Sequence, residues 1–178
     1  MNIIIVGCGK VGRSLVEQLS SENHDISIVD PKAYVVQSMV DMYDVFGIVG
    51  NGASYNVLTE VGVEEADLLI AVTNSDELNL LCCLIAKKAG KCATIARVSN
   101  PVYFDEINFI KEEMGISMII NPELAAASEM SRILRIPTAM EINSFAKGKV
   151  ELLKFVLRTS SILNGMRIKE IGERMRGE

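Results

Sequence analysis

Three glycines near the start of the chain have the spacing of a phosphate-binding loop. The stretch VGCGKVG places Gly7, Gly9 and Gly12 between an apolar run and a segment with helical periodicity. In a strand–turn–helix of this kind the first glycine permits a tight turn, the second lets a pyrophosphate approach the backbone, and the third allows close helix packing. The free N–H groups at the start of the helix then face the phosphates. The spacing therefore predicts a nucleotide site at residues 7–12.

An acidic residue stands where such a site needs one. Asp30 ends the next apolar run, ISIVD, about 20 residues beyond the loop, where a carboxylate accepts hydrogen bonds from an adenosine ribose. It would repel a 2′-phosphate, and no Arg follows it directly. The residues therefore favour NAD(H) over NADP(H), although the ribose of ATP or ADP would fit equally well.

Polar residues at the ends of three later apolar runs are further binding candidates, because ligands of open α/β sheets bind at the carboxyl ends of the strands. Two groups directly follow a run, and Arg97 lies near the end of the run TIARV. Asn51 and Gly52 lie in GNGAS, and Thr73 and Asn74 lie in TNSDE. The amide and hydroxyl groups could reach a ribose, base, phosphate or nicotinamide, and Arg97 could pair with a phosphate. The alternative is that these residues have no binding role and serve only as turn residues, a helix cap and a surface arginine.

No catalytic group is predicted beside these binding residues. The only histidine, His24, precedes the second apolar run and is expected at the opposite edge of the sheet. None of the four tyrosines is followed by Lys four positions later, as short-chain dehydrogenases require. The cysteines show neither CxxC spacing nor nearby histidines, so we expect buried side chains and no metal site; they are Cys8, Cys82, Cys83 and Cys92.

Short apolar runs alternate with amphipathic segments along most of the chain, a pattern typical of βαβ units. The runs are continuously apolar, which requires cover on both faces of the sheet. We therefore expect an α/β fold with a Rossmann-like, doubly wound parallel sheet. Strands are expected at 3–6, 26–29, 45–49, 68–72, 94–98 and 117–120, and helices at 11–22, 33–43, 54–62, 76–90, 104–114 and 122–135.

The pattern changes after Pro137. TAMEINSF and KVELLKFVL predict two strands joined by AKGK, followed by a turn at LNG and a helical piece, MRIKEIGERM. This tail is too short to bury a core of its own. We therefore assign 1–137 to the nucleotide-binding domain and 138–178 to the start of a small, truncated α+β domain.

Composition narrows the function further. A net charge of −5 disfavours binding to nucleic acid, which needs clustered Lys and Arg. The start MNIIIVG lacks a basic leader, and no apolar run approaches the ~20 residues that cross a bilayer. We expect a cytoplasmic protein without direct membrane insertion.

Several of these stretches together resemble the nucleotide-binding domain of the TrkA family, also called the KTN or RCK domain. They are VGCGKVG, SIVD, GNGAS, ADLLIAVTNSDELNLLCCLIAK and IARV, and the resemblance covers about residues 1–135. FAKGKVELLKFVL and SILNGMRIKEI are similar to the beginning of the TrkA C-terminal domain. The family comprises regulatory subunits of Trk-type potassium uptake systems.

The resemblance implies a regulatory subunit, not an enzyme, that binds NAD(H) or ATP and ADP and gates a membrane potassium transporter. It implies a homo-oligomer, either a dimer or a tetrameric ring, held at the inner face of the cell membrane by its partner. Lys10 stands where some relatives contact the terminal phosphate of a neighbouring subunit's ATP, and Asn51 stands where relatives often carry Asp. The matching positions are Gly7, Cys8, Gly9, Lys10, Val11, Gly12, Asp30, Asn51, Gly52, Thr73, Asn74 and Arg97.

Two alternatives stay open at this point. One is a fragment of an NAD-dependent oxidoreductase whose catalytic part lies beyond residue 178. The other is a redox-sensing transcription factor, which the acidic charge disfavours.

The surplus of apolar residues in helices 76–90 and 122–135 further predicts that both helices bury a face against sister subunits.

Overall fold

The computed structural model describes residues 1–103, 105–135, 139–145, 150–157 and 159–174. The chain separates into two compact units, Met1–Leu124 and Ala125–Glu178. This division falls inside one helix, whereas the sequence pattern changes after Pro137. The assignment of 138–178 to the start of a second family domain stays a prediction.

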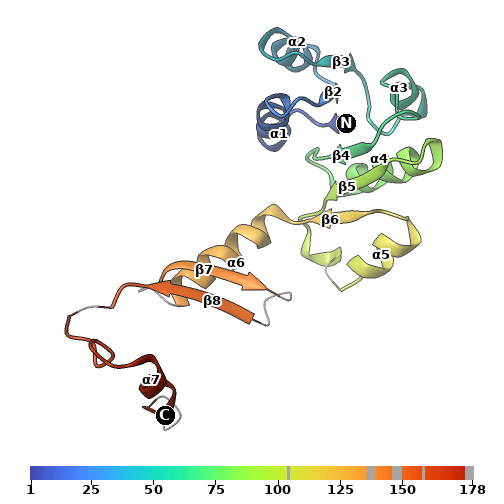
Figure 1. The fold of residues 1–178 in the computed structure, drawn as a ribbon. Coiled ribbons are helices and arrows are strands. Elements are labelled where there is room, and N and C mark those ends of the chain that lie inside the picture. Colours follow the sequence, from blue (N-terminus) through green and yellow to red (C-terminus); the bar gives the residue numbers. More distant parts are fainter. Residues whose placement is uncertain (104, 136–138, 146–149, 158, 175–178) are drawn as a thin grey trace. The chain divides into compact units, whose positions relative to one another are not determined.

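The first unit is built on a six-stranded sheet with the order β3-β2-β1-β4-β5-β6, and every neighbouring pair is parallel (Figure 1). The predicted Rossmann-like fold is confirmed. The order runs outward in both directions from β1 and β4, so the crevice above their carboxyl ends is where such sheets bind ligands. The strands are β1 (Asn2–Val6), β2 (Asp25–Asp30), β3 (Phe46–Val49), β4 (Leu68–Ala71), β5 (Ala93–Arg97) and β6 (Met118–Ile120).

Helices follow the strands in strict alternation, and each is close to its predicted range. The largest difference is at α5, which begins at Ile107 after a short 3-10 turn, η1, at Pro101–Tyr103. The helices of this unit are α1 (Lys10–Ser20), α2 (Ala33–Met42), α3 (Tyr55–Glu60), α4 (Asp76–Ala89) and α5 (Ile107–Glu113), and α6 (Pro122–Arg135) starts here.

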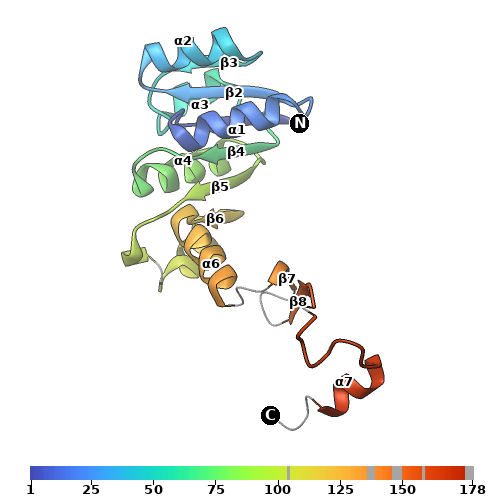
Figure 2. The ribbon, with the colours of Figure 1, turned by 90° about the vertical axis from the view of Figure 1, so that its left-hand side faces the viewer.

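Alternate side chains of β1 enter two separate cores, because successive residues of a strand face opposite sides of the sheet. Ile3 and Ile5 pack under α1 and α2, whereas Ile4 and Val6 pack under α3 and α4. Figure 2 shows α1 and α2 on the sheet face nearer the viewer. Since both faces are covered, the continuous apolar character of the strands is explained.

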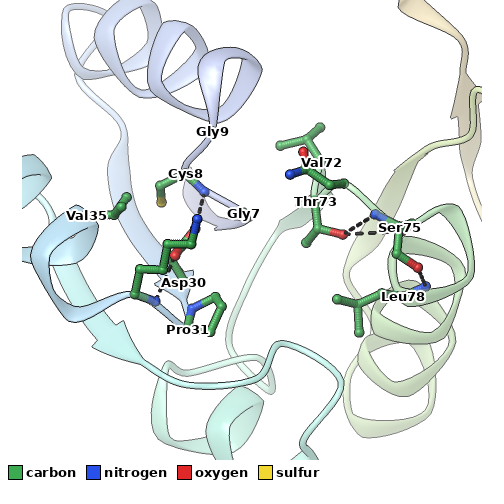
Figure 3. Close-up of a pocket in the computed structure, with 12 residues that line it drawn as sticks. Gly7, Cys8, Gly9, Asp30, Pro31, Val35, Val72, Thr73, Ser75 and Leu78 are labelled. Atoms are coloured by element: carbon green, nitrogen blue, oxygen red, sulfur yellow. Dashed lines mark hydrogen bonds between the residues drawn. The ribbon is translucent and has the colours of Figure 1, made fainter.

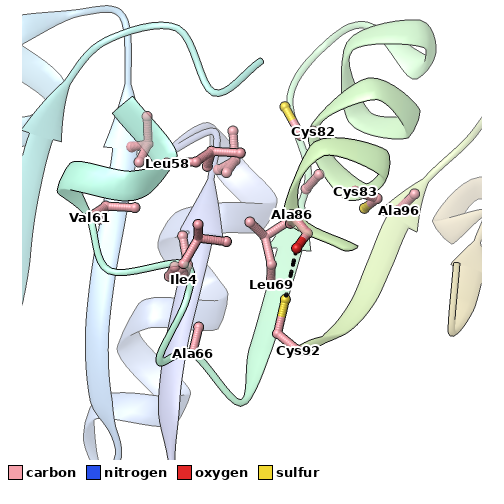
Figure 4. Close-up of a cluster of buried hydrophobic side chains, with 14 of the residues drawn as sticks. Ile4, Leu58, Val61, Ala66, Leu69, Cys82, Cys83, Ala86, Cys92 and Ala96 are labelled. Carbon is pink, nitrogen blue, oxygen red and sulfur yellow. Dashed lines mark hydrogen bonds between the residues drawn. The ribbon is translucent and has the colours of Figure 1, made fainter. Parts of the chain in front are cut away.

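The four cysteines are buried free thiols, as predicted. Cys82, Cys83 and Cys92 belong to the core under α4 together with Ala86 and Leu69 (Figure 4). Burial raises the pKa of the Cys82 and Cys83 thiols to about 12, so they act as small apolar side chains.

Most of the apolar side chains of α4 are buried within the first unit. Leu80, Cys82, Cys83 and Ala86 are buried, and Leu81 is the large apolar side chain of this helix that stays exposed. The prediction that α4 keeps a broad face for a sister subunit is therefore not supported. None of the described helices is both long and apolar enough to cross a bilayer.

The second unit contains most of α6, an antiparallel pair of strands and a last helix. The strands β7 (Ala139–Phe145) and β8 (Val150–Phe155) pair as the tail sequence predicts, and α7 spans Ile168–Arg174. The predicted AKGK connection lies outside the described residues. Large apolar side chains along α6 are exposed, namely Leu124, Met130, Ile133 and Leu134.

Candidate functional site

A cleft of about 360 Å³ opens at the carboxyl ends of β1, β2 and β4, where the strand order reverses. We call it the central cleft. Figure 3 shows the glycine loop and the end of β2 on one side, and the end of β4 with the start of α4 on the other. Its lining residues are Gly7, Cys8, Gly9, Asp30, Pro31, Lys32, Val35, Val72, Thr73, Asn74, Ser75 and Leu78.

The glycine loop has the geometry that the spacing predicts. Gly7 has φ +94°, a conformation that favours glycine, and its N–H donates to the Val29 carbonyl at 2.8 Å. A Cβ at Gly12 would lie 2.0 Å from the Gly7 carbonyl oxygen, so this position holds α1 against the loop. A Cβ at Gly9 would meet nothing within 4 Å, and no side chain caps α1. The backbone at Gly9 is therefore accessible to a ligand.

Asp30 is held rigidly in the central cleft. Its Oδ2 accepts the Cys8 N–H at 2.9 Å, and its Oδ1 accepts the Lys32 N–H at 2.9 Å (Figure 3). Each carboxylate oxygen can accept a second bond, so donors on a ligand can still be bound. The side chain thus ties the glycine loop to the end of β2 while presenting a fixed negative charge.

Cys8 and Lys10 differ in their relation to the cleft. Burial, with the nearby charge of Asp30, raises the pKa of the Cys8 thiol to about 12, which leaves no thiolate at neutral pH. Lys10 is exposed at the first position of α1 and Val11 packs against the core under α1, so neither lines the central cleft.

A second cavity of about 300 Å³ adjoins the central cleft and shares Gly7, Pro31, Thr73 and Leu78 with it. We call it the apolar pocket, since Val6, Val29, Pro31 and Leu78 contribute to its walls. The two residues predicted here, Asn51 and Gly52, both line it.

Local packing explains part of the predicted Asn51–Gly52 motif. The Asn51 Oδ1 accepts the Ala53 N–H at 2.9 Å, as in an Asx turn. A Cβ at Gly52 would lie 2.1 Å from Val6 and 3.2 Å from the Cys82 sulfur. Gly52 is therefore required by the core, whatever the pocket holds.

A third cavity, the polar cleft of about 420 Å³, meets the central cleft at Asn74 and Ser75 and contains Arg97. The Arg97 guanidinium pairs with Glu123 and also donates to the Thr73 carbonyl at 3.4 Å. Glu123 in turn accepts the Ser99 hydroxyl at 2.8 Å. Arg97 is thus near the predicted place, but a phosphate would have to compete with Glu123 for it.

Asp76 organises the rim of the polar cleft. Its Oδ2 accepts the N–H groups of Ser99 and Asn100 at 2.9 and 2.7 Å, which fixes the turn after β5. Beside it, the Glu77 carboxylate accepts hydrogen bonds from Ser75 and Tyr103. The backbone N–H of Glu77 is the main cause that lowers the pKa of its carboxyl, and these two hydroxyls lower the pKa further.

Sequence reasoning missed Asn79, the buried residue that organises the end of β4. Its Oδ1 accepts the Thr73 N–H at 2.8 Å and the Thr73 hydroxyl at 2.7 Å. Its Nδ2 donates to the carbonyls of Arg97 at 2.9 Å and of Thr73 at 3.3 Å. Both hydrogen-bond donors of Thr73, its N–H and its hydroxyl, are therefore bonded within the protein, whereas Asn74 is exposed between the clefts. The available signal was an amide on the buried face of an apolar helix.

His24 lies before β2, at the edge of the sheet opposite the central cleft, as predicted. Its Nε2 is 3.6 Å from Glu22. Among the residues that the structure describes, no group of three His, Cys, Asp or Glu side chains could hold a metal ion.

Comparison with known proteins adds a family assignment to this geometry. The family model described as the TrkA-N domain matches residues 3–122. The chain is 38% identical to a Trk system potassium uptake protein TrkA homolog of Archaeoglobus fulgidus, over 96% of this chain and 39% of that protein. It is 35% identical to the TrkA protein of Vibrio alginolyticus, over 98% and 39%. The chain thus spans about two fifths of the length of these curated relatives.

Solved structures resemble the fold at low sequence identity. The TrkA-N domain of the inner membrane protein ybaL from Escherichia coli matches with a TM-score of 0.67 and 22% identity, over 75% of this chain and 96% of that one. The GsuK channel bound to NAD matches with 0.57 and 22%, over 80% and 24%. The AMP-bound Kef C-terminal domain of Shewanella denitrificans matches with 0.63 and 20%, over 79% and 84%.

Proposed function

The chain belongs to the TrkA-N domain family, and from this we propose that it binds NAD(H) or an adenine nucleotide in the central cleft as a regulatory subunit of a membrane potassium transporter. The observation that carries the proposal is the meeting of an open glycine loop and a rigid carboxylate in one cleft. The relatives carry potassium uptake names, and the GsuK and Kef structures carry bound NAD and AMP, which supports both halves.

The three cavities suit the parts of a nucleotide. The Asp30 carboxylate can accept the ribose hydroxyls, and the open backbone at Gly9 with the start of α1 can receive phosphates. The apolar pocket beside Asp30 suits an adenine ring. A second nucleoside would then reach the polar cleft by way of Asn74.

The side chains at the central cleft favour binding over catalysis. Cys8 is held as a neutral thiol, and both oxygens of Asp30 already accept backbone hydrogen bonds. The Cys8 thiol is therefore not a nucleophile at neutral pH, and the backbone hydrogen bonds of Asp30 hold its carboxylate in place for recognition. A bound dinucleotide would bring the capacity for hydride transfer, but these residues supply only recognition and orientation.

Regulation requires that the nucleotide bind one geometry of an assembly better than another. A coupling free energy of about 1–3 kcal/mol would bias a transporter by roughly 5- to 150-fold. We propose that the assembly is a homo-oligomer that uses α6, whose apolar side chains Met130, Ile133 and Leu134 are exposed. Its place would be the cytoplasmic side of the membrane, against the transporter.

Calorimetric titration of the chain with NAD, NADH, ATP and ADP tests the binding proposal. Gly9→Ala is the variant to compare with the wild type. Its added Cβ would meet no protein atom within 4 Å, but it would lie where we propose that the phosphates bind. We expect Gly9→Ala to weaken binding by about tenfold or more, which is at least ~1.4 kcal/mol, with little change in unfolding. Equal binding by both proteins would refute phosphate recognition at this loop.

The regulatory half of the proposal needs its own tests. Incubation of the protein with NADH and a panel of carbonyl substrates, followed at 340 nm, should show no turnover, and sustained oxidation would favour the oxidoreductase alternative. In vesicles that contain a Trk-type transporter, added protein should make potassium flux depend on nucleotide. A potassium flux that does not change with nucleotide would contradict gating. A flux that responds to nucleotide with Gly9→Ala as it does with the wild type would contradict phosphate recognition at the glycine loop.

A further inference from the structure

Asn79 lies behind the clefts and is fully buried, with an exposed fraction of 0%. Its side chain makes four hydrogen bonds, two as acceptor and two as donor, all to Thr73 and Arg97. Four is the full capacity of a carboxamide, so nothing is left for a ligand. Any effect of Asn79 on binding must therefore act through these two partners.

Thr73 forms part of the floor of the central cleft. A Cβ at Gly7 would lie 2.8 Å from the Thr73 nitrogen and 2.9 Å from its Cα, so the two main chains are in direct contact. Because Asn79 binds the N–H, hydroxyl and carbonyl of Thr73, it fixes where this residue meets the glycine loop.

Arg97 belongs to the polar cleft, on the next strand of the sheet. The Asn79 amide holds its carbonyl at 2.9 Å, while the Arg97 guanidinium reaches back to the Thr73 carbonyl. A single buried side chain therefore links the floor of the central cleft to the wall of the polar cleft.

We propose that Asn79 is a positioning residue that keeps the central and polar clefts in register, and that it thereby determines how much more tightly the chain binds a dinucleotide than a mononucleotide. The inference rests on the proposed nucleotide site. A mononucleotide needs the central cleft and the apolar pocket, whereas a dinucleotide must also fit the polar cleft. A shift between the clefts therefore penalises the dinucleotide more than the mononucleotide.

The test compares NAD with AMP on wild-type protein and on Asn79→Ala, by calorimetry under conditions where both are folded. We expect Asn79→Ala to weaken NAD binding by about tenfold or more, the factor that one good hydrogen bond represents, and AMP binding by less than about threefold. Thr73→Val leaves the Asn79 bonds to the Thr73 backbone and to Arg97 in place, and removes the Thr73 hydroxyl with its contacts to Asn79 and to the Ser75 backbone. It should shift the NAD-to-AMP ratio in the same direction by less. Thr73→Val also provides the test of the inference if Asn79→Ala does not fold.

Thr94→Val is the matched control for loss of a buried polar group. Thr94 is also 0% exposed, and its hydroxyl accepts the Ser117 N–H near the amino end of β5, away from the clefts. It should lower stability and leave the ratio unchanged. If Asn79→Ala weakens NAD and AMP by the same factor, or changes stability alone, the inference is wrong. If the wild-type chain binds neither nucleotide, the proposed function itself fails and the inference fails with it.

Discussion

Replacement of Asp30 by Ala should lower both stability and nucleotide affinity, because this carboxylate accepts backbone hydrogen bonds and, as we propose, binds the ribose. In the folded chain it accepts the N–H groups of Cys8 and Lys32, each at 2.9 Å. The Cys8 N–H is buried and would lose its acceptor, which costs about 1–3 kcal/mol of unfolding free energy. Lys32 is exposed, so water can replace the lost partner there.

These contacts set the expected magnitudes for Asp30→Ala. A loss of about 2 kcal/mol corresponds to a fall of roughly 4–8 °C in melting temperature for a chain of this size. Loss of the ribose hydrogen bonds to a charged acceptor should weaken NAD or ATP by about 1.5–3 kcal/mol, or roughly 10- to 150-fold.

Thermal unfolding and calorimetric titration measure the two effects separately. Asp25→Ala is the control, since Asp25 is an exposed carboxylate at the other end of β2. It should change neither quantity appreciably. If Asp30→Ala melts earlier yet binds nucleotides as the wild type does, Asp30 is only a tie between the glycine loop and β2, and the proposed recognition of the ribose is wrong.

Other predictions follow from the core and from the rim of the polar cleft. Gly12→Ala should destabilise the chain by about 1–3 kcal/mol in urea titrations, because its Cβ would meet the Gly7 carbonyl oxygen at 2.0 Å, and unchanged stability would contradict this packing. The Ser99 hydroxyl, followed by the backbone N–H of Glu123 and by Arg97, lowers the pKa of the Glu123 carboxyl below its usual 4.5. The contribution of the ionised carboxylate to stability is therefore present above pH 4.5 and is lost as the pH falls through the lower pKa of the folded state. Glu123→Gln should therefore make the urea midpoint depend less on pH in that range, and an unchanged pH dependence would contradict this. The four buried thiols should resist alkylation at pH 8 until the chain unfolds, and rapid labelling of the native protein would contradict their burial.

Much of the fold could be predicted because local signals and global architecture agree here. Continuous apolar strands such as Ile3–Val6 can be covered only by helices on both faces, and the alternation of strands and helices leaves few topologies. The glycine spacing and Asp30 were also predictable, because the turn, the helix packing and the carboxylate tie each demand a particular residue type.

The less predictable parts depend on contacts between distant segments. The pairing of Arg97 with Glu123 and the bond from Asn79 to the Arg97 carbonyl join residues that only the folded sheet brings together. Likewise, the apolar residues of α4 looked like a surplus because the sequence does not reveal that α3 packs beside it. Periodicity counts apolar side chains, but it does not say how many neighbours cover them.

The most direct test of nucleotide recognition at the central cleft is a crystal structure of the chain grown with saturating NAD. We predict an adenosine ribose bonded to Asp30, with the pyrophosphate against Gly9 and the first turn of α1. Ligand density at the amino edge of the sheet near His24, or a central cleft without nucleotide although calorimetry shows binding, would contradict the account.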